Sequence, residues 1–178
     1  MDLFDTKNLD TPDYDWTIEE FIELAKALPQ YSFELVLNDT QENIDAFMQK
    51  NSISKPGNLA LHPRQNDVAP FYNRATLVLN LSNKNLVVET FGLTALEAMH
   101  TGLPVIVPTV GGIAEMVENG VNGYKIDVQD VVKIKEKIEN IISNRDLYLS
   151  LSNRALSSAG RYSTNRMFEN ILHEIETA

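Results

Sequence analysis

Two glutamates, Glu89 and Glu97, lie eight positions apart around a Phe-Gly pair in the stretch VVETFGLTALEAMHTGLPV. Strand-like residues precede this stretch, and the residues after Gly92 have the spacing of a helix. In open parallel sheets, the free amides at the start of such a helix face anions. Gly92 lets a ligand approach the backbone closely, so the amides that follow it, beginning with those of Leu93 and Thr94, form an expected diphosphate cradle.

Carboxylates beside such a cradle suit the hydroxyl groups of a sugar and a ribose, because carboxylate oxygens accept hydrogen bonds. A nucleotide sugar presents sugar, diphosphate and ribose in a row. A structural interpretation stays open, since Thr94 and Glu97 have the spacing of a capping box and the helix dipole favours an acidic residue there. Gly111 and Gly112 follow the next strand. The preferred interpretation of this pair is a tight turn, and the weaker one is a second anion cradle.

The elements that position these residues alternate between helix and strand. Apolar spacing predicts strands over 31–38, 57–63, 76–82, 103–109 and 123–126, with helices over 16–28, 41–50, 67–75, 90–102 and 111–120. Thr40 or Asp39 can cap the helix over 41–50, and terminal helices follow from about 128 to 178. The alternation predicts an α/β fold, a doubly wound, Rossmann-like parallel sheet in a single domain over residues 1–178.

The start of the chain departs from this pattern. A doubly wound domain normally opens with a buried apolar strand, yet residues 1–15 contain five aspartates and offer only Leu3 and Phe4 as an apolar pair. The first strand is therefore expected to be minimal, or the chain to be a fragment cut near it.

Composition narrows the class of protein. The 178 residues are 43% hydrophobic and 22% charged, which is typical of a globular protein, and the net charge of -10 argues against a nucleic-acid partner. The chain has no cysteine, no histidine pair with metal spacing, and no apolar run near the 20 residues of a membrane helix. Its acidic start differs from a signal peptide, so a soluble, cytoplasmic protein without a transmembrane segment is expected.

The wider string ETFGLTALEAMHTGLPVIVPTVGGIAEMVENGVNG resembles the donor-site signature of retaining glycosyltransferases with the GT-B fold, most closely glycosyltransferase family 4. The family motif has two glutamates separated by seven residues, which Glu89 and Glu97 match. Phe91 and Gly92 match its Phe-Gly pair. EAMHTGLPV matches the continuation of that motif, and weaker similarity extends over most of the chain.

The resemblance implies a role for each matching residue. Glu97 would hold the ribose hydroxyls, and Glu89 would be the catalytic-site carboxylate that contacts the transferred sugar. The backbone from Phe91 and Gly92 through Leu93 to Thr94 would meet the diphosphate and the sugar. The family generally works without a bound metal, so the resemblance implies no cofactor, and positive side chains and helix dipoles would neutralise the departing diphosphate.

Basic residues are the second part of the implied site. Family members carry an Arg and a Lys after the first strand, and Lys7 matches the lysine, although no arginine precedes it. Lys84, in the loop before Glu89, is a second candidate by position. His62 and Arg64 end the strand over 57–63, where the family often contacts the base. Gly111 and Gly112 continue the donor pattern.

The length of the chain matches one of the two domains of a GT-B enzyme. We therefore expect the C-terminal, donor-binding half of an enzyme that transfers a sugar from a nucleotide diphosphate sugar to an acceptor hydroxyl in polysaccharide or glycan biosynthesis. A missing N-terminal domain would hold the acceptor glycan or lipid-linked sugar, and the full-length enzyme could be peripheral at the membrane. A non-catalytic Rossmann-like docking domain and another GT-B enzyme, such as a sugar-nucleotide epimerase, remain open alternatives.

Overall fold

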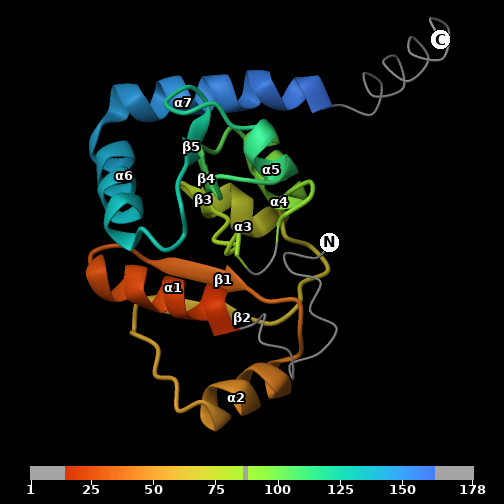
Figure 1. Cartoon of the computed structure of the whole chain (residues 1–178), viewed down its shortest axis with the longest axis vertical. Helices are drawn as coiled ribbons and strands as arrows, with labels where there is room; N and C mark the ends of the chain where they lie inside the picture. The colour runs from red at the N-terminus through yellow and green to blue at the C-terminus, as the bar shows by residue number, and fades with distance from the viewer. Residues whose placement is uncertain (1–14, 86–87, 163–178) are drawn as a thin grey trace, which may run out of the picture.

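The computed structural model describes residues 15–85 and 88–162, in which helices and strands alternate as the sequence predicts (Figure 1). The strands are β1 (Phe33–Val36), β2 (Leu59–His62), β3 (Val78–Leu79), β4 (Val105–Val107) and β5 (Gly123–Lys125). The helices are α1 (Asp15–Ala27), α2 (Gln41–Lys50), α3 (Ala69–Arg74), α4 (Leu93–His100), α5 (Gly112–Glu115), α6 (Val131–Ser143) and α7 (Arg145–Ala159), followed by the 3-10 turn η2 (Gly160–Tyr162).

All strand pairs are parallel, which confirms the predicted fold class. β1 pairs with β2, with Phe33 opposite Leu59, and β4 pairs with both β3 and β5, with Val105 between Val78 and Gly123. The described strands nevertheless form two sheets, β1-β2 and β3-β4-β5, rather than one continuous sheet. The expected minimal first strand falls within residues 1–14, outside the described residues.

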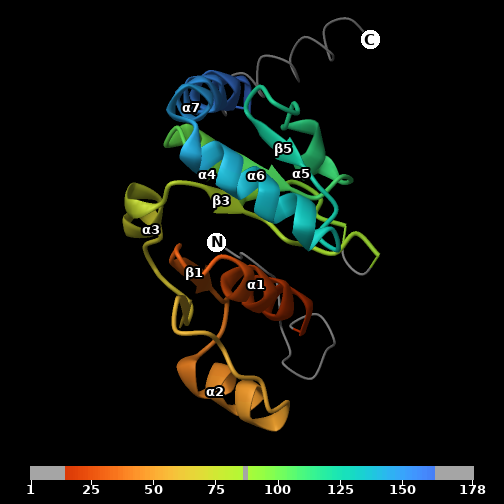
Figure 2. The ribbon, with the colours of Figure 1, turned by 90° about the vertical axis from the view of Figure 1, so that its left-hand side faces the viewer.

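Helices cover both faces of the strands, as a doubly wound fold requires (Figure 2). Alternate residues of β4 show the two faces, since Ile106 belongs to one apolar cluster and Val105 and Val107 belong to the other. The first cluster includes side chains of α1, α2 and α6, and the second includes side chains of α4 and α7. α4 packs on α7 through small side chains, among them Ala95, Ala98, Ala155 and Ala159.

Several predicted boundaries are too wide. α4 begins at Leu93 rather than near residue 90, α5 ends at Glu115, and β3 is limited to the two residues that pair with β4. Thr40 is the N-cap of α2, as predicted, and its side chain accepts a hydrogen bond from the amide of Asn43. The terminal helices α6 and α7 lie within the predicted range, of which residues 163–178 are outside the described part.

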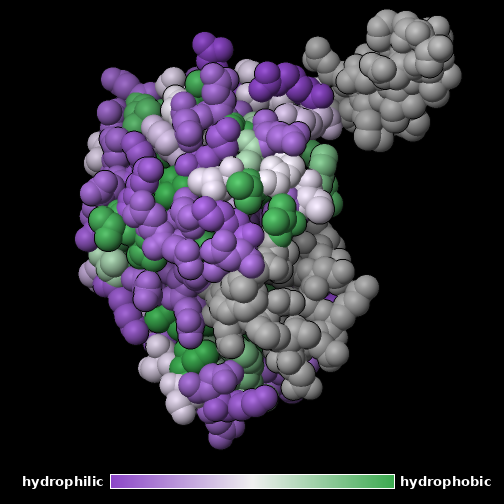
Figure 3. All heavy atoms as spheres, in the orientation of Figure 1, coloured by the Kyte–Doolittle hydropathy of each residue, from purple (hydrophilic) through white to green (hydrophobic). Residues whose placement is uncertain are grey.

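The surface in Figure 3 is largely hydrophilic where residues are described, with hydrophobic side chains in small groups. Within the described ranges, no helix has the length and apolar character that crossing a membrane requires.

Candidate functional site

The start of α4 is built around a left-handed glycine. Gly92, the N-cap, has φ 73° and ψ 54°, and its carbonyl accepts the amides of Ala95 and Leu96. A Cβ on Gly92 would overlap with the side chain of Ile113, so only glycine fits both the backbone and the space. The amides of Leu93 and Thr94 have no hydrogen-bond partner among the described residues, which is the arrangement that favours an anion at the start of a helix.

Glu89 lies against the same helix start. One of its carboxylate oxygens, Oε1, accepts long hydrogen bonds from the amides of Phe91, at 3.4 Å, and Gly92, at 3.2 Å. The helix dipole favours this negative group. The structure thus brings Glu89, the predicted catalytic carboxylate, to the predicted cradle. Glu89 accepts from the amides of Phe91 and Gly92, and the amides of Leu93 and Thr94 are the remaining donors of the cradle.

Gly111 and Gly112 pack directly against the backbone of the loop that carries Glu89. A Cβ on Gly111 would overlap with the carbonyl oxygen of Glu89, and a Cβ on Gly112 with that of Thr90. Gly111 also has φ 92°, which favours glycine. These contacts support the tight-turn interpretation of the glycine pair, because its role here is to let the two loop backbones touch.

Glu97 projects from the second turn of α4 and contacts Tyr72 of α3. The Tyr72 hydroxyl donates to Glu97 Oε2 at 3.1 Å and lies 3.4 Å from the carbonyl oxygen of Thr94. The capping-box interpretation of Thr94 and Glu97 is wrong, because Gly92 is the N-cap and Thr94 is a buried residue inside the helix. Burial raises the pKa of the Tyr72 phenol, and the negative charge of Glu97 raises it further.

The candidate basic residues are paired within the protein. Lys84 Nζ lies 2.7 Å from Asp127 Oδ2, and this hydrogen bond holds the pKa of Asp127 below its usual value. Arg64 donates from Nε to the side-chain oxygen of Asn38 and from Nη2, at 3.2 Å, to the Asn38 carbonyl oxygen. Both residues lie beyond the carboxyl ends of strands, the edge at which α4 begins. Lys7 is outside the described residues.

Apolar side chains surround the helix start. Phe91 and Leu93 are 46% and 51% exposed, and Val88 and Val110 are also exposed. Large apolar side chains on a surface can mark a contact region for a ligand or another protein segment. In the described ranges, no group of three His, Asp or Glu side chains is placed to hold a metal ion.

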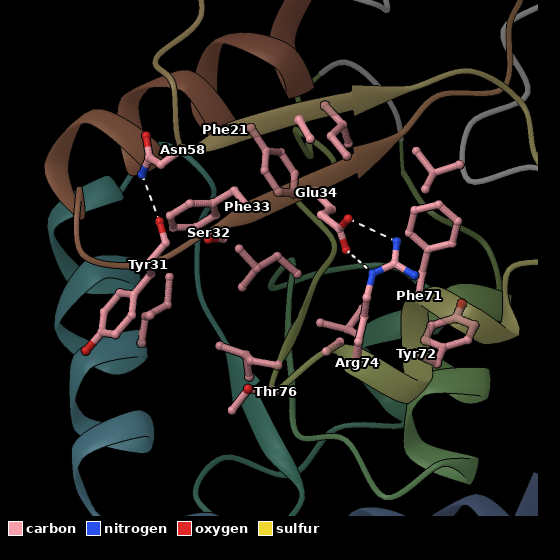
Figure 4. Close-up of a pocket in the computed structure, with 18 of the residues that line it drawn as sticks. Phe21, Tyr31, Ser32, Phe33, Glu34, Asn58, Phe71, Tyr72, Arg74 and Thr76 are labelled. Carbon is pink, nitrogen blue, oxygen red and sulfur yellow. Dashed lines mark hydrogen bonds and ion pairs between the residues drawn. The ribbon is translucent and has the colours of Figure 1, made fainter.

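A cavity of about 720 Å³ separates β1 from β3 and reaches the site at one end (Figure 4). Asn80 and Thr94 line that end, and Tyr72 lines the side formed by α3. Arg74 of α3 spans the cavity to Glu34 of β1 with two hydrogen bonds of 2.8 and 2.9 Å. These bonds hold the pKa of Glu34 below its usual value.

Sequence reasoning missed two of these residues. Tyr72 contacts Glu97 from 25 positions earlier in the chain, and Asp127 pairs with Lys84 from a loop after β5. Each belongs to a segment whose sequence indicates only a short helix or a loop. The sequence carries no motif that links either residue to its partner.

The chain belongs to the family described as Glycosyl transferases group 1, whose sequence profile matches residues 15–158. Among curated relatives, the N-acetyl-alpha-D-glucosaminyl L-malate synthase of Bacillus anthracis is 35% identical over 95 residues, which are 53% of this chain and 24% of that protein. An uncharacterized glycosyltransferase of Haemophilus influenzae is 25% identical over 158 residues, or 88% of this chain and 43% of that protein. The chain thus spans less than half the length of these relatives.

Solved structures share the fold. A crystal structure of Anabaena HepE in complex with UDP matches 94% of this chain and 47% of that chain, with a TM-score of 0.76 and 19% identity. The C-terminal domain of a glycosyl transferase group 1 family protein, LpcC of Francisella tularensis, matches 83% of this chain and 79% of that chain, with a TM-score of 0.64 and 22% identity. The chain therefore has the fold of one half of a GT-B glycosyltransferase.

Proposed function

We propose that this chain is the donor-binding half of a retaining glycosyltransferase of family 4, which moves a sugar from a nucleoside diphosphate to an acceptor hydroxyl. The observation that carries the proposal is the make-up of the first two turns of α4: Glu89 lies against the Gly92 amide, the amides of Leu93 and Thr94 have no partner among the described residues, and Glu97 follows one turn later. Family membership and the likeness to a structure determined with UDP-glucose support it.

In this proposal each group acts on one part of the donor. The Leu93 and Thr94 amides and the dipole of α4 stabilise the diphosphate as negative charge develops on it. Glu97 accepts hydrogen bonds from the ribose hydroxyls, and Glu89 lies toward the sugar. Lys84 remains the candidate cation of the β3–α4 loop, with its charge shared with Asp127.

The acceptor belongs to the rest of the enzyme. We place the acceptor, a glycan or lipid-linked sugar, in an N-terminal half outside this chain, and polysaccharide or glycan biosynthesis as the setting. The exposed Phe91 and Leu93 at the site supply an apolar surface against which such a half can close.

Thermal unfolding with UDP, GDP and ADP tests whether the chain binds the donor. A ligand that binds only the folded state at 100 times its Kd adds about 2.7 kcal/mol to the free energy of unfolding, or about 5 to 10 °C in Tm for a domain of this size. We expect such a rise with at least one of the three, and a smaller rise with inorganic pyrophosphate. No rise with any of them would support the docking-domain alternative.

Glu89→Gln tests the catalytic carboxylate in the full-length enzyme. We expect the rate of transfer to fall about 100-fold or more. A neutral amide stabilises the positive charge that develops on the transferred sugar less well than a carboxylate does. Nucleoside diphosphate affinity should change little. Glu136→Gln, an exposed position on α6, removes the same charge far from the site and should leave transfer unchanged. An unchanged rate in Glu89→Gln would remove that residue from the mechanism.

A further inference from the structure

Tyr72 is a buried residue whose polar end reaches the candidate site. Only 9% of the residue is exposed, and its ring packs in the same apolar cluster as α4 and α7. Its hydroxyl lies between the first and second turns of α4, where it contacts the Glu97 carboxylate and lies near the Thr94 carbonyl oxygen. The side chain thus connects the backbone of α3 to a carboxylate at the site.

Glu97 depends on this contact for its orientation. In the described part of the chain, Tyr72 is the side chain that donates to the Glu97 carboxylate, which is otherwise partly exposed. A partly exposed glutamate samples several rotamers, and ordering one of them on ligand binding costs conformational entropy. A hydrogen bond that is already formed lowers this cost, which is the usual benefit of preorganisation.

The hydrogen bond has a fixed direction. Because the Tyr72 phenol remains protonated in its buried place, it donates, and the carboxylate accepts through Oε2. Oε1 and the remaining lone pair of Oε2 are left to accept hydrogen bonds from the hydroxyl groups of a ligand. The contact therefore orients Glu97 without using up its acceptor capacity.

Tyr72 is itself held in place by its helix. Two residues further along α3, Arg74 donates to Glu34 of β1 and to the carbonyl oxygen of Pro70, and its guanidinium lies 4.2 Å from the centre of the Phe71 ring (Figure 4). The bond to Glu34 ties the C-terminal end of α3 to β1, and the other two contacts hold the Arg74 side chain against its own helix. A rigid helix is a better support for a site residue than a loop.

We propose that Tyr72 is a positioning residue for ribose recognition, holding the Glu97 carboxylate in the orientation that accepts the ribose hydroxyls. The inference rests on the proposed function, because it takes Glu97 as the ribose-binding group. Tyr72 touches no reacting atom, and its effect passes through Glu97. The consequence is a preference for ribose over deoxyribose that depends on a residue of another helix.

Tyr72→Phe tests this role, since it removes the hydroxyl and keeps the ring in the core. The affinities for the nucleoside diphosphate that binds best and for its 2′,3′-dideoxy analogue are measured by calorimetry. We expect Tyr72→Phe to weaken the ribonucleotide about tenfold, as for a lost hydrogen bond to a charged group, and to leave the dideoxy analogue nearly unchanged. The ratio of the two affinities should fall toward one.

Two comparisons separate positioning from structure. Tyr31→Phe removes a hydroxyl from the other end of the same cavity and should keep the wild-type ratio. In Glu97→Gln the ratio of the two affinities should fall to about one. The double variant Tyr72→Phe/Glu97→Gln should bind the ribonucleotide no more weakly than Glu97→Gln alone, because Tyr72 acts through Glu97. Partial unfolding would not disguise the result, since it lowers both apparent affinities by the same fraction.

The outcomes are distinct. If the wild-type chain prefers ribose and Tyr72→Phe keeps that preference, or weakens both ligands equally, the positioning role is overturned and the proposed function stands. If the wild-type chain binds the ribonucleotide and its dideoxy analogue equally, Glu97 does not read the ribose and the inference falls with that assignment. If it binds no nucleoside diphosphate, the proposed function fails first.

Discussion

At the scale of single residues, the position of Glu89 depends on glycines that offer no side chain to a ligand. The loop over 88–92 rests on Gly111 and Gly112, and the backbone atoms of the two segments are in direct contact. A backbone contact cannot be relieved by a rotamer change, so any added atom must move the loop. The carboxylate of Glu89 and the first amides of α4 would move with it.

Gly112→Ala tests this dependence. Its Cβ would overlap with the carbonyl oxygen of Thr90, so we expect the free energy of unfolding to fall by about 2 kcal/mol and nucleoside diphosphate affinity to fall with it. Urea unfolding and calorimetry provide the two measurements. Gly57→Ala is the matched control, because no atom lies within 4 Å of its added Cβ. Equal stability in the two variants would contradict the packing argument.

The types and spacing of residues in the site were predictable, and their partners were not. A glycine at the start of the helix and a carboxylate beside it were predicted from local sequence preferences, whereas the left-handed conformation of Gly92 is seen only in the structure. The capping-box prediction for Thr94 failed because a glycine in the left-handed region begins the helix before Thr94, which then lies inside it. Tyr72 and Asp127 could not be foreseen, since only the tertiary fold brings them to Glu97 and Lys84.

At the scale of elements, two strand edges face each other across the cavity. The amides of Phe33 and Leu37 bond to residues in and beside β2, and those of Val78 and Asn80 bond to residues in and beside β4. Because backbone groups alternate along a strand, the amides of Glu34, Val36 and the residues flanking Val78 point to the other edge. Among the described strands, that edge of β1 and of β3 has no neighbour.

Hydrogen exchange followed by NMR tests this arrangement. We expect the amides of Glu34 and Leu79 to exchange at least about tenfold faster than those of Leu37 and Asn80, because the latter pair is bonded within a sheet. Glu34 is compared with Leu37 and Leu79 with Asn80, because the two amides of each pair lie on the same short segment and share its local unfolding. Equal protection on both edges would mean that another segment pairs there.

The alternation of elements was predictable because hydrophobic period reports which faces are buried. The same period says nothing about which strand lies beside which, so the division into two sheets could not be read from it. The predicted element lengths were wrong for a related reason, because the apolar pattern does not show how far a strand stays paired with its neighbour. The strand predicted over 76–82 is apolar at four of its seven positions, yet only Val78 and Leu79 pair in register with β4.

At the scale of the whole molecule, Glu20 makes stability depend on pH. Burial of its carboxylate raises the pKa to about 7, and repulsion from Glu19 and Glu23 adds to the shift. The folded state therefore binds the proton more tightly than the unfolded chain, whose glutamate has the usual pKa. The penalty is absent below about pH 4.5, grows as pH rises, and is complete above about pH 7.

Glu20→Gln removes this penalty. We expect the variant to be more stable than the wild type at pH 8, by about 1 kcal/mol because part of the side chain is screened by water, and no more stable at pH 4. Urea unfolding at the two pH values measures the difference. Glu19→Gln removes the same charge at an exposed neighbouring position and should show a smaller change with pH. A gain for Glu20→Gln that is equal at both pH values would contradict this assignment.

The packing of α4 on α7 has a consequence for how this protein can diversify. The helix that carries Glu97 is supported from behind by alanines, including Ala98 and Ala155, which have no exposed surface. Replacing one of them by a larger residue would tilt α4 and shift its first amides, since the distance between helices follows the side chains between them. If the chain binds a nucleotide sugar as proposed, its donor selectivity can therefore change through substitutions in α7, which lies outside the stretch from Glu89 to Glu97 in the sequence.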